Sequence, residues 1–528
     1  MNKRLLLGDE AIAQAAIDAG ISGVYAYPGT PSTEIATYIQ QQVKAHALAI
    51  VDKWATNEKT ALEAALGLSY VGKRALCCMK HVGLNVAADA FMNAAMTGVR
   101  GGLVIVAADD PSMHSSQNEQ DSRFYGDFAM IPILEPACQQ EAYDMMRYAF
   151  DLSESLQTPV LMRITTRLAH ARAGVQFSHP PLHQKEASIP LDTSSFVLLP
   201  AISRRQYKRL LTLQTAFEQA AQDSPYNFFK KGVQKKTGVI ACGITINYLD
   251  EYFTKLRVHP TLKVSQYPIS RKQVMELLDY VDEVLVLEEG APFVERQLRG
   301  LLNKTFPIKG RLDGTLPRDG ELSPDIVAEA LQLPHGPVFE KPAIVMPRPP
   351  ALCKGCGHRD VYTILNDVLK SYPQHRIFGD IGCYTLGALP PFLSIHSCVD
   401  MGASITMAKG AADGGIWPAI AIIGDSTFAH SGMTGLLDCV NAHASVTIIL
   451  SDNETTAMTG GQDSAACGRL EQIVAGLGVD PDHIRVFVPL PKNYEMMRQI
   501  IDEEINYQGV SVIIPRRECL QTLKRKKA

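Results

Sequence analysis

The run Pro418-Ala-Ile-Ala-Ile-Ile-Gly-Asp-Ser426 is an apolar, β-branched segment that breaks into a turn. A second such run, Val446-Thr-Ile-Ile-Leu450, leads into Asp452-Asn-Glu-Thr455. Short apolar runs bounded by turn residues are typical of buried strands. A helical stretch from about Gly435 to His443 separates them. The pattern therefore predicts two adjacent parallel strands in an α/β fold.

The polar residues after these two strands form a candidate metal site. Open α/β sheets bind ligands at the carboxyl ends of their strands, so we expect Asp425 and Asn453 at one sheet edge. Mg²⁺ prefers oxygen donors and takes few protein ligands together with phosphate oxygens and water. The Asp425 carboxylate, the Asn453 amide oxygen and the Thr455 carbonyl would suffice. Either half alone reads as an ordinary turn, but the two halves at this spacing favour the metal.

These motifs resemble those of a known family. Gly424-Asp425-Ser426 with Asn453 is similar to the thiamine diphosphate fingerprint, and Asp452–Gln462 resembles the matching stretch of the 2-oxoacid:ferredoxin oxidoreductases of the indolepyruvate type. The similarity covers nearly the whole chain, through Gly8-Asp-Glu-Ala-Ile12, Tyr27-Pro-Gly-Thr-Pro-Ser-Thr-Glu34, Asn57-Glu-Lys59, Met79-Lys-His-Val-Gly-Leu-Asn85, His114-Ser-Ser-Gln-Asn-Glu-Gln120 and Asp400-Met-Gly-Ala-Ser404. The resemblance implies thiamine diphosphate with Mg²⁺, held by Gly382, Gly424, Asp425, Ser426, Asn453 and Thr455.

The composition fits a globular protein without nucleic acid or membrane partners. The chain has 528 residues, of which 46% are hydrophobic and 20% charged, enough for about three domains. The net charge of −4 argues against nucleic acid as a general partner. The sequence has no apolar run long enough to span a membrane and no signal-peptide pattern. We therefore expect a cytoplasmic protein.

The expected architecture is α/β with three domains, in which two parallel-sheet domains of the thiamine-diphosphate-binding type flank a smaller α/β domain. Stretches rich in proline, at 177–200 and 334–350, separate residues 1–185, 200–335 and 351–528. Strands are expected at 23–27, 47–51, 74–79, 102–107, 159–163, 238–243, 283–288 and 509–515. The resemblance implies that the first domain binds the aminopyrimidine of the cofactor and the third its pyrophosphate.

Glu58 is the candidate activating acid. Thiamine chemistry needs a carbanion at C2 of the thiazolium ring, and one carboxyl group must hydrogen-bond N1′ to generate it. Glu58 occupies the matching position of the family in Thr56-Asn-Glu-Lys59. The plainer alternative is an acidic residue that complements the dipole at the start of a helix. The resemblance favours the catalytic interpretation.

Four cysteines are candidates for an iron–sulfur cluster. Cys353 and Cys356 form a C-x-x-C pair, Cys383 follows Gly379-Asp-Ile-Gly382, and Cys519 lies just past the last expected strand. A cubane cluster needs four thiolates, whereas zinc or a redox dithiol would explain the pair alone. The family's cluster nearest to thiamine is held by cysteines in similar motifs, which implies a [4Fe–4S] cluster. Cys77, Cys78, Cys398, Cys439 and Cys467 are interpreted as packing residues.

The large subunits of this family commonly continue into a ferredoxin-like domain with repeated C-x-x-C-x-x-C-x-x-x-C runs, and this sequence contains no run of that pattern. Electrons are therefore expected to pass to ferredoxin or another separate carrier. A smaller catalytic subunit is the second expected partner, in a hetero-oligomer built on a homodimer.

Three further residues are candidate substrate contacts. Thr30 lies in a motif in which the family places a threonine near the oxoacid, although Thr30 or Ser32 before Glu34 also suits a helix cap. Arg123 resembles an arginine that binds the substrate carboxylate, with a surface arginine as the alternative. His81 is either a pocket residue or a satisfied buried histidine.

Together these features predict oxidative decarboxylation of an arylpyruvate to its acyl-CoA, with coenzyme A as co-substrate. A non-oxidative thiamine diphosphate decarboxylase or synthase is the alternative, since it would share Asp425, Asn453 and Glu58 but need no clustered thiolates. A non-catalytic scaffolding protein is a third possibility, against which the intact Glu58 and metal motif argue.

Overall fold

The computed structural model describes residues 3–52, 54–177, 180–187, 194–196, 198–252, 258–301, 306–317, 320–334, 342–346, 350–398, 401–413 and 415–527. The chain divides into two compact units, Met1–Phe339 and Glu340–Ala528. Helices and largely parallel sheets alternate in both units, so the predicted α/β fold is confirmed. The three-domain boundaries stay a prediction, and parts of both proline-rich stretches, as well as Asp400, lie outside the described residues.

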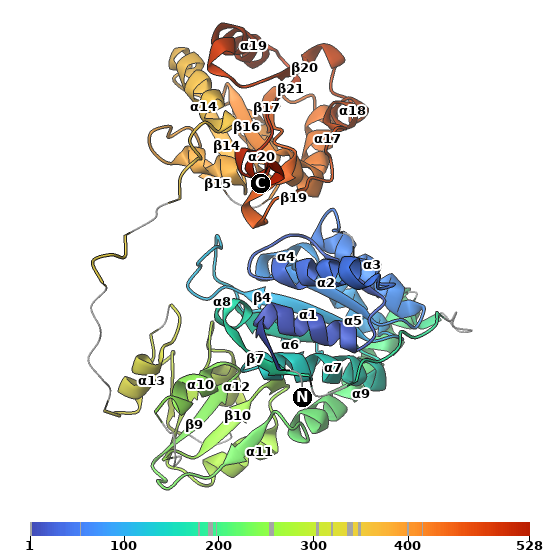
Figure 1. The fold of residues 1–528 in the computed structure, drawn as a ribbon, viewed down its shortest axis with the longest axis vertical. Helices are drawn as coiled ribbons and strands as arrows, with labels where there is room; N and C mark the ends of the chain where they lie inside the picture. Colours follow the sequence, from blue (N-terminus) through green and yellow to red (C-terminus); the bar gives the residue numbers. More distant parts are fainter. Residues whose placement is uncertain are drawn as a thin grey trace. The chain divides into compact units, whose positions relative to one another are not determined.

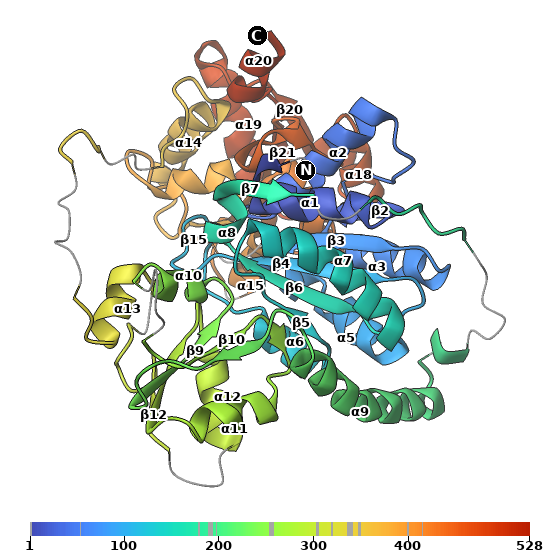
Figure 2. The same ribbon diagram turned by 60° about the horizontal axis from the view of Figure 1, so that its bottom comes forward.

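The first unit contains a six-stranded sheet, a five-stranded sheet and a two-stranded ribbon (Figures 1 and 2). The six-stranded sheet has the order β11-β5-β6-β4-β3-β2, with β11 antiparallel to β5 and the other neighbours parallel. The five-stranded sheet has the order β13-β12-β9-β10-β8, and β1 pairs with β7. The strands are β1 (Lys3–Leu7), β2 (Gly23–Ala26), β3 (Ala75–Lys80), β4 (Leu103–Asp109), β5 (Ile133–Leu134), β6 (Val160–Thr165), β7 (Arg172–Gln176), β8 (Phe228–Lys230), β9 (Thr237–Cys242), β10 (Thr261–Val264), β11 (Gln266–Tyr267), β12 (Glu283–Leu287) and β13 (Ile308–Lys309).

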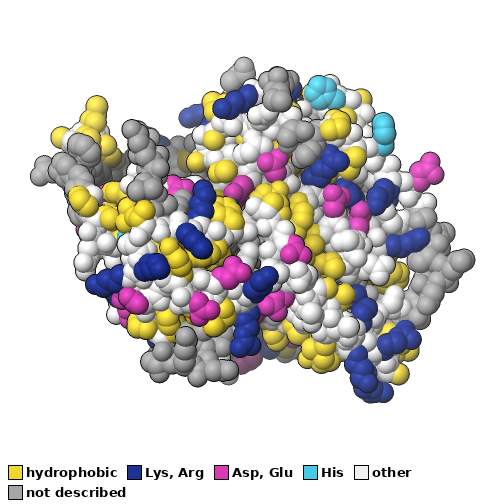
Figure 3. Space-filling view, turned by 90° about the horizontal axis from the view of Figure 1, so that it is seen from below, with side chains coloured by type: hydrophobic (Ala, Val, Ile, Leu, Met, Phe, Trp, Pro, Cys, Tyr) yellow, Lys and Arg dark blue, Asp and Glu magenta, His cyan; other side chains and the backbone are white. Residues whose placement is uncertain are grey.

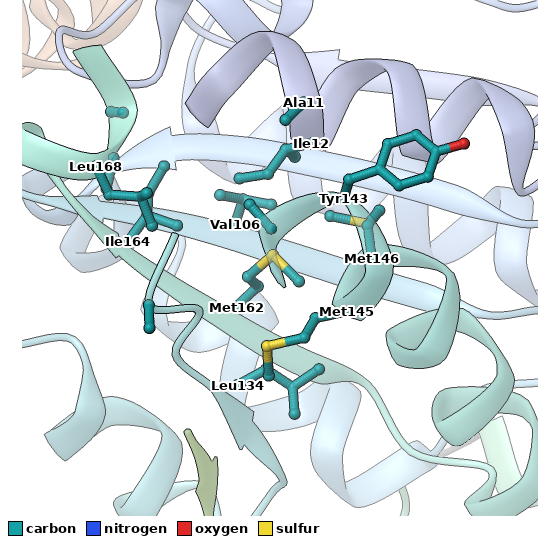
Figure 4. Close-up of a cluster of buried hydrophobic side chains, with 14 of the residues drawn as sticks. Ala11, Ile12, Val106, Leu134, Tyr143, Met145, Met146, Met162, Ile164 and Leu168 are labelled. Atoms are coloured by element: carbon teal, nitrogen blue, oxygen red, sulfur yellow. The ribbon is translucent and has the colours of Figure 1, made fainter. Parts of the chain in front are cut away.

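Helices cover both faces of the six-stranded sheet, and successive residues of each strand point to opposite faces. On β4, Val104 and Val106 pack with α1 and α7, while Leu103 and Ile105 pack with α3 and α5. Figure 4 shows the first of these cores, in which Ile12 and Met146 from the covering helices meet Val106, Met162 and other strand residues. The helices of this unit are α1 (Gly8–Asp18), α2 (Thr33–His46), α3 (Glu58–Tyr70), α4 (His81–Val86), α5 (Ala88–Thr97), α6 (Arg123–Phe128), α7 (Gln139–Leu156), α8 (Thr166–His170), α9 (Pro200–Gln222), α10 (Thr245–Asp250), α11 (Arg271–Leu278), α12 (Phe293–Leu301) and α13 (Pro324–Ala330).

One expected strand of the first unit is wrong. Ala47, the first residue of the expected strand at 47–51, has a left-handed backbone conformation that ends α2. The segment then makes isolated parallel bridges to β2, Gly23 with Val51 and Ala26 with Trp54, and forms no strand. The apolar run there reflects contact with the edge of the sheet without a continuous ladder.

The second unit is built on a parallel six-stranded sheet in the order β15-β14-β16-β17-β21-β20, with a small β18–β19 hairpin. Its strands are β14 (Arg376–Gly379), β15 (Ser397–Cys398), β16 (Ala419–Gly424), β17 (Val446–Ser451), β18 (Thr455–Thr456), β19 (Gln462–Asp463), β20 (Ile484–Phe487) and β21 (Val510–Pro515). Its helices are α14 (Gly357–Val368), α15 (Ala403–Asp413), α16 (Asp425–Thr427), α17 (Met433–Asn441), α18 (Leu470–Gly476), α19 (Tyr494–Asn506) and α20 (Leu520–Lys527). Ile423 and Leu450 pack with α15 and α17 on one face, and Ile422 and Ile449 pack with α14 and α19 on the other.

The surface carries charges of both signs. Figure 3 shows lysine and arginine side chains interspersed with aspartate and glutamate on the face that it draws. Among the described residues, none of the helices has the length and apolar character needed to cross a bilayer.

Candidate functional site

The ends of two central strands bring acidic side chains together in the second unit. β16 and β17 are adjacent and parallel, as predicted, with Gly424 opposite Ser451. Asp425 follows β16 directly and opens the short helix α16. Asp452 and Asn453 follow β17. The register therefore places both segments at the same edge of the sheet.

The Asp425 carboxyl group is buried without full compensation. The residue is 2% exposed, and Oδ2 has no hydrogen-bond partner among the described residues. Burial, together with the nearby Asp452, raises the pKa of Asp425 to about 7. A buried carboxylate with an unused oxygen is costly unless a cation compensates it, so this position suits a metal ligand.

The loop after β17 is held beside α16 by side-chain hydrogen bonds. Ser426 Oγ and Thr456 Oγ1 are 2.8 Å apart. The Thr455 hydroxyl donates to the Gln462 carbonyl at 2.9 Å, and the Thr455 amide donates to Asn453 Oδ1 at 3.3 Å. These contacts fix the two segments that carry the predicted ligands.

Gly382 and Gly424 flank the ring of Tyr384, which was not among the site residues predicted from the sequence. A Cβ atom on Gly382 would lie 2.2 Å from a ring carbon of Tyr384, and one on Gly424 would lie 2.8 Å from it. The Tyr384 hydroxyl donates to Asp380, which also accepts from Ser404 Oγ at 2.7 Å. Burial raises the pKa of Asp380 to about 6. Asp380 follows β14 at the same sheet edge as Asp425. This position directly after a strand is the sequence signal that could have identified Asp380 as a site residue.

The four cysteines predicted to act together line one cavity of the second unit. Cys353, Cys356, Cys383 and Cys519 all border a cavity of about 110 Å³. Asp452 and Asn453 border the same cavity, which joins the thiols to the loop after β17. The cavity thus brings together the segment after the proline-rich linker and the segments after β14 and β21. The carboxyl ends of parallel strands lie at one edge of a sheet, which explains why the two strand ends meet.

The thiols are close enough to influence one another electrostatically. Burial, with contributions from the other three thiols, raises the pKa of Cys383 to about 12, and burial and two neighbouring thiols also raise that of Cys356. Among the described residues, no three of the four sulfurs lie within 4.8 Å of one another. Four sulfurs around one zinc ion would be roughly 3.8 Å apart, so the thiols are not already in the arrangement of a closed zinc site.

The five cysteines that were interpreted as packing residues divide into two groups. Cys77, Cys78 and Cys439 are fully buried, as expected of packing residues. The interpretation is wrong for Cys398 and Cys467, which are exposed. Cys398 is the last residue of the short strand β15 and Cys467 lies within the turn before α18, where local sequence gives little information on exposure.

Glu58 is the first residue of α3 in the first unit and is 5% exposed. Asn57 caps the helix by accepting from the Thr60 amide at 2.9 Å. A Cβ atom on Gly83 would lie 2.5 Å from Glu58 Oε1. The glycine therefore lets the carboxyl group reach its buried position, which a simple solvent-facing helix acid would not need.

His81 and Thr30 lie at the ends of neighbouring strands. His81, 1% exposed, donates from Nε2 to the Asn118 carbonyl at 3.2 Å, while its Nδ1 has no hydrogen bond among the described residues. Thr30 is half-buried in the turn between β2 and α2. Ser32 stands at the N-cap position of α2, but its side chain does not accept a hydrogen bond from a backbone amide of the helix. Its hydroxyl donates to the Gly29 carbonyl instead.

The structure contradicts one of the two interpretations of Arg123, the surface arginine. The residue is 0% exposed, so it is not a surface arginine. Its guanidinium donates from Nε to Asp121 at 2.9 Å and from Nη2 to the Glu289 carbonyl at 3.0 Å, and Nη1 pairs with Glu288 at 3.1 Å. These protein partners engage the guanidinium in this structure, and contact of Arg123 with a substrate carboxylate stays a prediction.

Replacing Arg123 with alanine should therefore act on stability. The change removes the ion pair of buried Glu288 and leaves buried Asp121 with only the longer pair to Arg163 at 4.0 Å, a defect that costs about 3–5 kcal/mol. Urea unfolding of the variant measures this cost, and Arg204→Ala, at an exposed position of α9, serves as the control. Unchanged stability combined with weaker binding of an anionic ligand would instead support contact with the substrate carboxylate.

The sequence matches two described families. Residues 14–191 match "Pyruvate flavodoxin/ferredoxin oxidoreductase, thiamine diP-bdg", and residues 380–514 match "Thiamine pyrophosphate enzyme, C-terminal TPP binding domain". The first match contains Thr30, Glu58, His81 and Arg123, and the second contains Cys383, Asp425, Asn453 and Thr455.

Curated relatives resemble this chain over almost its full length. The "Indolepyruvate oxidoreductase subunit IorA" of Archaeoglobus fulgidus is 38% identical over 98% of this chain and 86% of its own length. The protein of the same name from Pyrococcus abyssi is 36% identical over 98% and 85%. A more distant relative, "2-oxoglutarate synthase subunit KorA" of Methanothermobacter thermautotrophicus, is 30% identical over 31% of this chain and 45% of its own.

A solved structure shares the fold. The 2-oxoglutarate:ferredoxin oxidoreductase from Magnetococcus marinus, with 2-oxoglutarate, coenzyme A and succinyl-CoA bound, aligns with a TM-score of 0.52 at 15% identity. The alignment covers 62% of this chain and 65% of that one.

Proposed function

Because this chain belongs to the family of the indolepyruvate oxidoreductase subunit IorA, among the thiamine-diphosphate-dependent 2-oxoacid:ferredoxin oxidoreductases, we propose that it catalyses the oxidative decarboxylation of an arylpyruvate. The products are the acyl-CoA, CO₂ and reduced ferredoxin. The indolepyruvate preference comes from the relatives' name, and coenzyme A is bound in the structural neighbour.

One observation carries this proposal. The cavity lined by four thiols is also lined by Asp452 and Asn453, which follow β17 beside Asp425. A redox group held by the thiols would thus adjoin a site suited to a metal and a pyrophosphate within a single unit. A non-oxidative decarboxylase or synthase would use the acidic site and have no need of the thiols, so the alternative is not favoured.

The strand-end residues fit Mg²⁺ and a pyrophosphate. Asp425 offers an unpartnered carboxylate oxygen, and Asn453 and Thr455 offer amide and backbone carbonyl oxygens beside it. These are the hard oxygen donors that Mg²⁺ uses together with phosphate oxygens. Gly382 and Gly424, whose side-chain space the Tyr384 ring fills, and Ser426 complete the proposed cofactor contacts.

Glu58 is proposed as the acid that acts on the aminopyrimidine. When bound, thiamine diphosphate supplies a carbanion at thiazolium C2 that adds to the keto carbon of the 2-oxoacid, so that CO₂ can leave. Glu58 would donate a hydrogen bond to N1′ of the bound cofactor, and its burial would keep water from that hydrogen bond. Gly83 is a positioning residue, because a side chain there would displace the Glu58 carboxyl group.

The four cysteines are proposed ligands of a [4Fe–4S] cluster. Four thiolates are the ligand set of such a cluster, and Cys353, Cys356, Cys383 and Cys519 line one cavity. The cluster would accept electrons one at a time and pass them to ferredoxin. The raised thiol pKa values of Cys356 and Cys383 indicate that metal binding must displace protons there.

Two residues of the first unit are proposed substrate contacts. Thr30 is half-buried in the turn after β2, where its hydroxyl can meet a ligand. Buried His81 has an unpartnered Nδ1 that can accept a hydrogen bond. A smaller catalytic subunit, a hetero-oligomer built on a homodimer and a cytoplasmic location belong to the same proposal.

The test is an anaerobic assay of the chain together with the smaller subunit. Ferredoxin reduction should require an arylpyruvate, coenzyme A and thiamine diphosphate. Release of an arylacetaldehyde at the same rate without ferredoxin would instead indicate the non-oxidative decarboxylase. No turnover of any 2-oxoacid by protein that binds the cofactor would indicate the non-catalytic alternative.

Replacing Glu58 with glutamine should lower the rate of C2 deprotonation by roughly 10²–10⁴, the scale of a lost acid–base group. Cofactor affinity should change little, because glutamine keeps the size and part of the hydrogen bonding. Exchange of the C2 proton with deuterium, followed by NMR, measures the step directly. Glu63→Gln, on the same helix but solvent-accessible and paired with Lys59, is the matched control. Wild-type exchange in Glu58→Gln would mean that another carboxyl group activates the cofactor.

A further inference from the structure

Three potential metal ligands meet in the first unit, outside the site described above. Asp9 lies in the first turn of α1, Glu34 in the first turn of α2, and His170 at the end of α8. α1 lies beside both other helices (Figure 1). One ligand atom of each residue lies within 4.8 Å of the corresponding atoms of the other two.

Asp9 is buried without any hydrogen bond. The residue is 0% exposed, and neither carboxylate oxygen has a partner among the described residues. Glu34 Oε2 is likewise buried without a hydrogen bond, and its contact is an ion pair with His170 Nε2 at 3.5 Å. Buried carboxylate oxygens are normally hydrogen-bonded, so three such oxygens together need an explanation.

The charges around Asp9 increase the need for a cation. Burial, followed by the nearby Glu34 and Glu10, raises the pKa of Asp9 well above its usual value. Glu10 is engaged elsewhere, since its Oε2 accepts from the Leu7 amide at 2.8 Å. His170 is the cationic partner in the cluster, and its pKa is raised by Glu34. One imidazolium leaves two carboxylates incompletely balanced, whereas a divalent ion would balance both.

We propose that Asp9, Glu34 and His170 bind a divalent transition-metal ion of the zinc type. One imidazole nitrogen and two carboxylate oxygens are ligands that Zn²⁺ accepts at 2.0–2.2 Å, and the imidazole disfavours Mg²⁺ or Ca²⁺. Two such ligands in a tetrahedral site are about 3.4 Å apart, so side-chain rotations that bring the three ligand atoms closer together would close the site. The side chains of His170 and Glu34 are 36% and 40% exposed, which leaves an entry path and room for a water ligand.

The ion would tie together the starts of α1 and α2 and the end of α8. The turn that carries Thr30 directly precedes α2, so the ion would also fix this turn at the end of β2. The inference concerns these three residues alone and does not depend on the proposed oxidoreductase activity.

The experiment uses the full chain, purified anaerobically with its thiol site loaded, freed of loose metal with a chelator and dialysed against Zn²⁺. Iron, magnesium and zinc are then measured separately by mass spectrometry. We expect about one zinc ion per chain, and zinc X-ray absorption with nitrogen and oxygen neighbours but no sulfur. Zinc coordinated by sulfur would place the ion at the cysteines and overturn the proposal.

Variants test the ligands one by one. Asp9→Asn and His170→Ala should each lose the bound zinc and the rise in melting temperature that Zn²⁺ causes in the wild type, with iron content unchanged. His114→Ala should keep both, because His114 forms a histidine–glutamate pair with Glu321 at 2.9 Å without being one of the three clustered ligands. If Asp9→Asn fails to fold, the partly exposed His170 still gives the result. Absence of zinc from the wild type would overturn the proposal and indicate that a shared proton balances Asp9 and Glu34. Zinc retained in His170→Ala would overturn it by placing the ion at other ligands.

Discussion

Cys356→Ala should lose the iron and the brown colour of the anaerobically purified protein, and with them all ferredoxin reduction. Cys356 is part of the C-x-x-C pair and lines the cavity shared with Cys353, Cys383 and Cys519. A cubane cluster requires four ligands, and no spare thiol borders that cavity among the described residues. Binding of thiamine diphosphate should persist, because the residues proposed to hold it follow β16 and β17. Iron analysis, visible absorption and calorimetry with the cofactor measure these outcomes.

The matched control is Cys439→Ala, which removes a buried thiol from the same unit. Cys439 lies on α17 within the core and does not border the cavity. This variant should keep its iron and lose only the stability expected for a small core change. Retained iron in Cys356→Ala would show that the four-cysteine assignment is wrong, and equal loss in both variants would indicate that destabilisation alone releases iron.

Asp425→Ala should abolish thiamine diphosphate binding while leaving the free protein as stable as the wild type or more so. The wild-type carboxyl group is buried with an unpartnered oxygen, so its removal relieves a folding cost. Binding should weaken by at least roughly 100-fold, since changes to residues that merely orient a metal ligand already cost 10–100-fold. Calorimetry with Mg²⁺ and the cofactor, combined with thermal unfolding of the free protein, separates the two effects. Asp438→Asn, at an exposed residue of α17 paired with Lys409, should change neither.

Cofactor binding should also depend on pH through Asp425. In the metal-free protein, burial and Asp452 raise the pKa of Asp425 to about 7, so the carboxyl group is largely protonated below that pH. Mg²⁺ binds the ionised form and must displace this proton. Affinity should therefore be highest above pH 7 and fall by up to about tenfold per pH unit below it. A pH-independent affinity, or tight binding by Asp425→Ala, would remove Asp425 from the metal site.

The sequence predicted much of the second unit because its signals are local. The apolar runs that end in Asp425 and Asp452 correspond to β16 and β17, which pair in parallel as expected. The predicted convergence of Cys353, Cys356, Cys383 and Cys519 is matched by the shared cavity. Parallel strands carry all their carboxyl ends to one edge, so motifs far apart in sequence meet there whenever each follows a strand.

The misses share a different cause, since they depend on contacts between distant segments. The residues around Arg123 form no local pattern that indicates burial. Its partners Glu288 and Glu289 follow β12, more than 160 residues later in the chain. β11 completes the first sheet by pairing with β5, although it follows β10 of the other sheet. Asp380 was passed over because β14 is short and only moderately apolar, so its strand end gave a weak signal.

The most direct test of the account is the visible spectrum of the anaerobically purified protein together with its iron and sulfide content. If the four cysteines hold a [4Fe–4S] cluster, we expect a brown protein whose broad absorption bleaches on reduction. It should contain about four iron and four sulfide ions per chain, the content of one cubane cluster. A colourless protein that binds thiamine diphosphate and carries zinc, or no metal, at Cys353 and Cys356 would contradict the account.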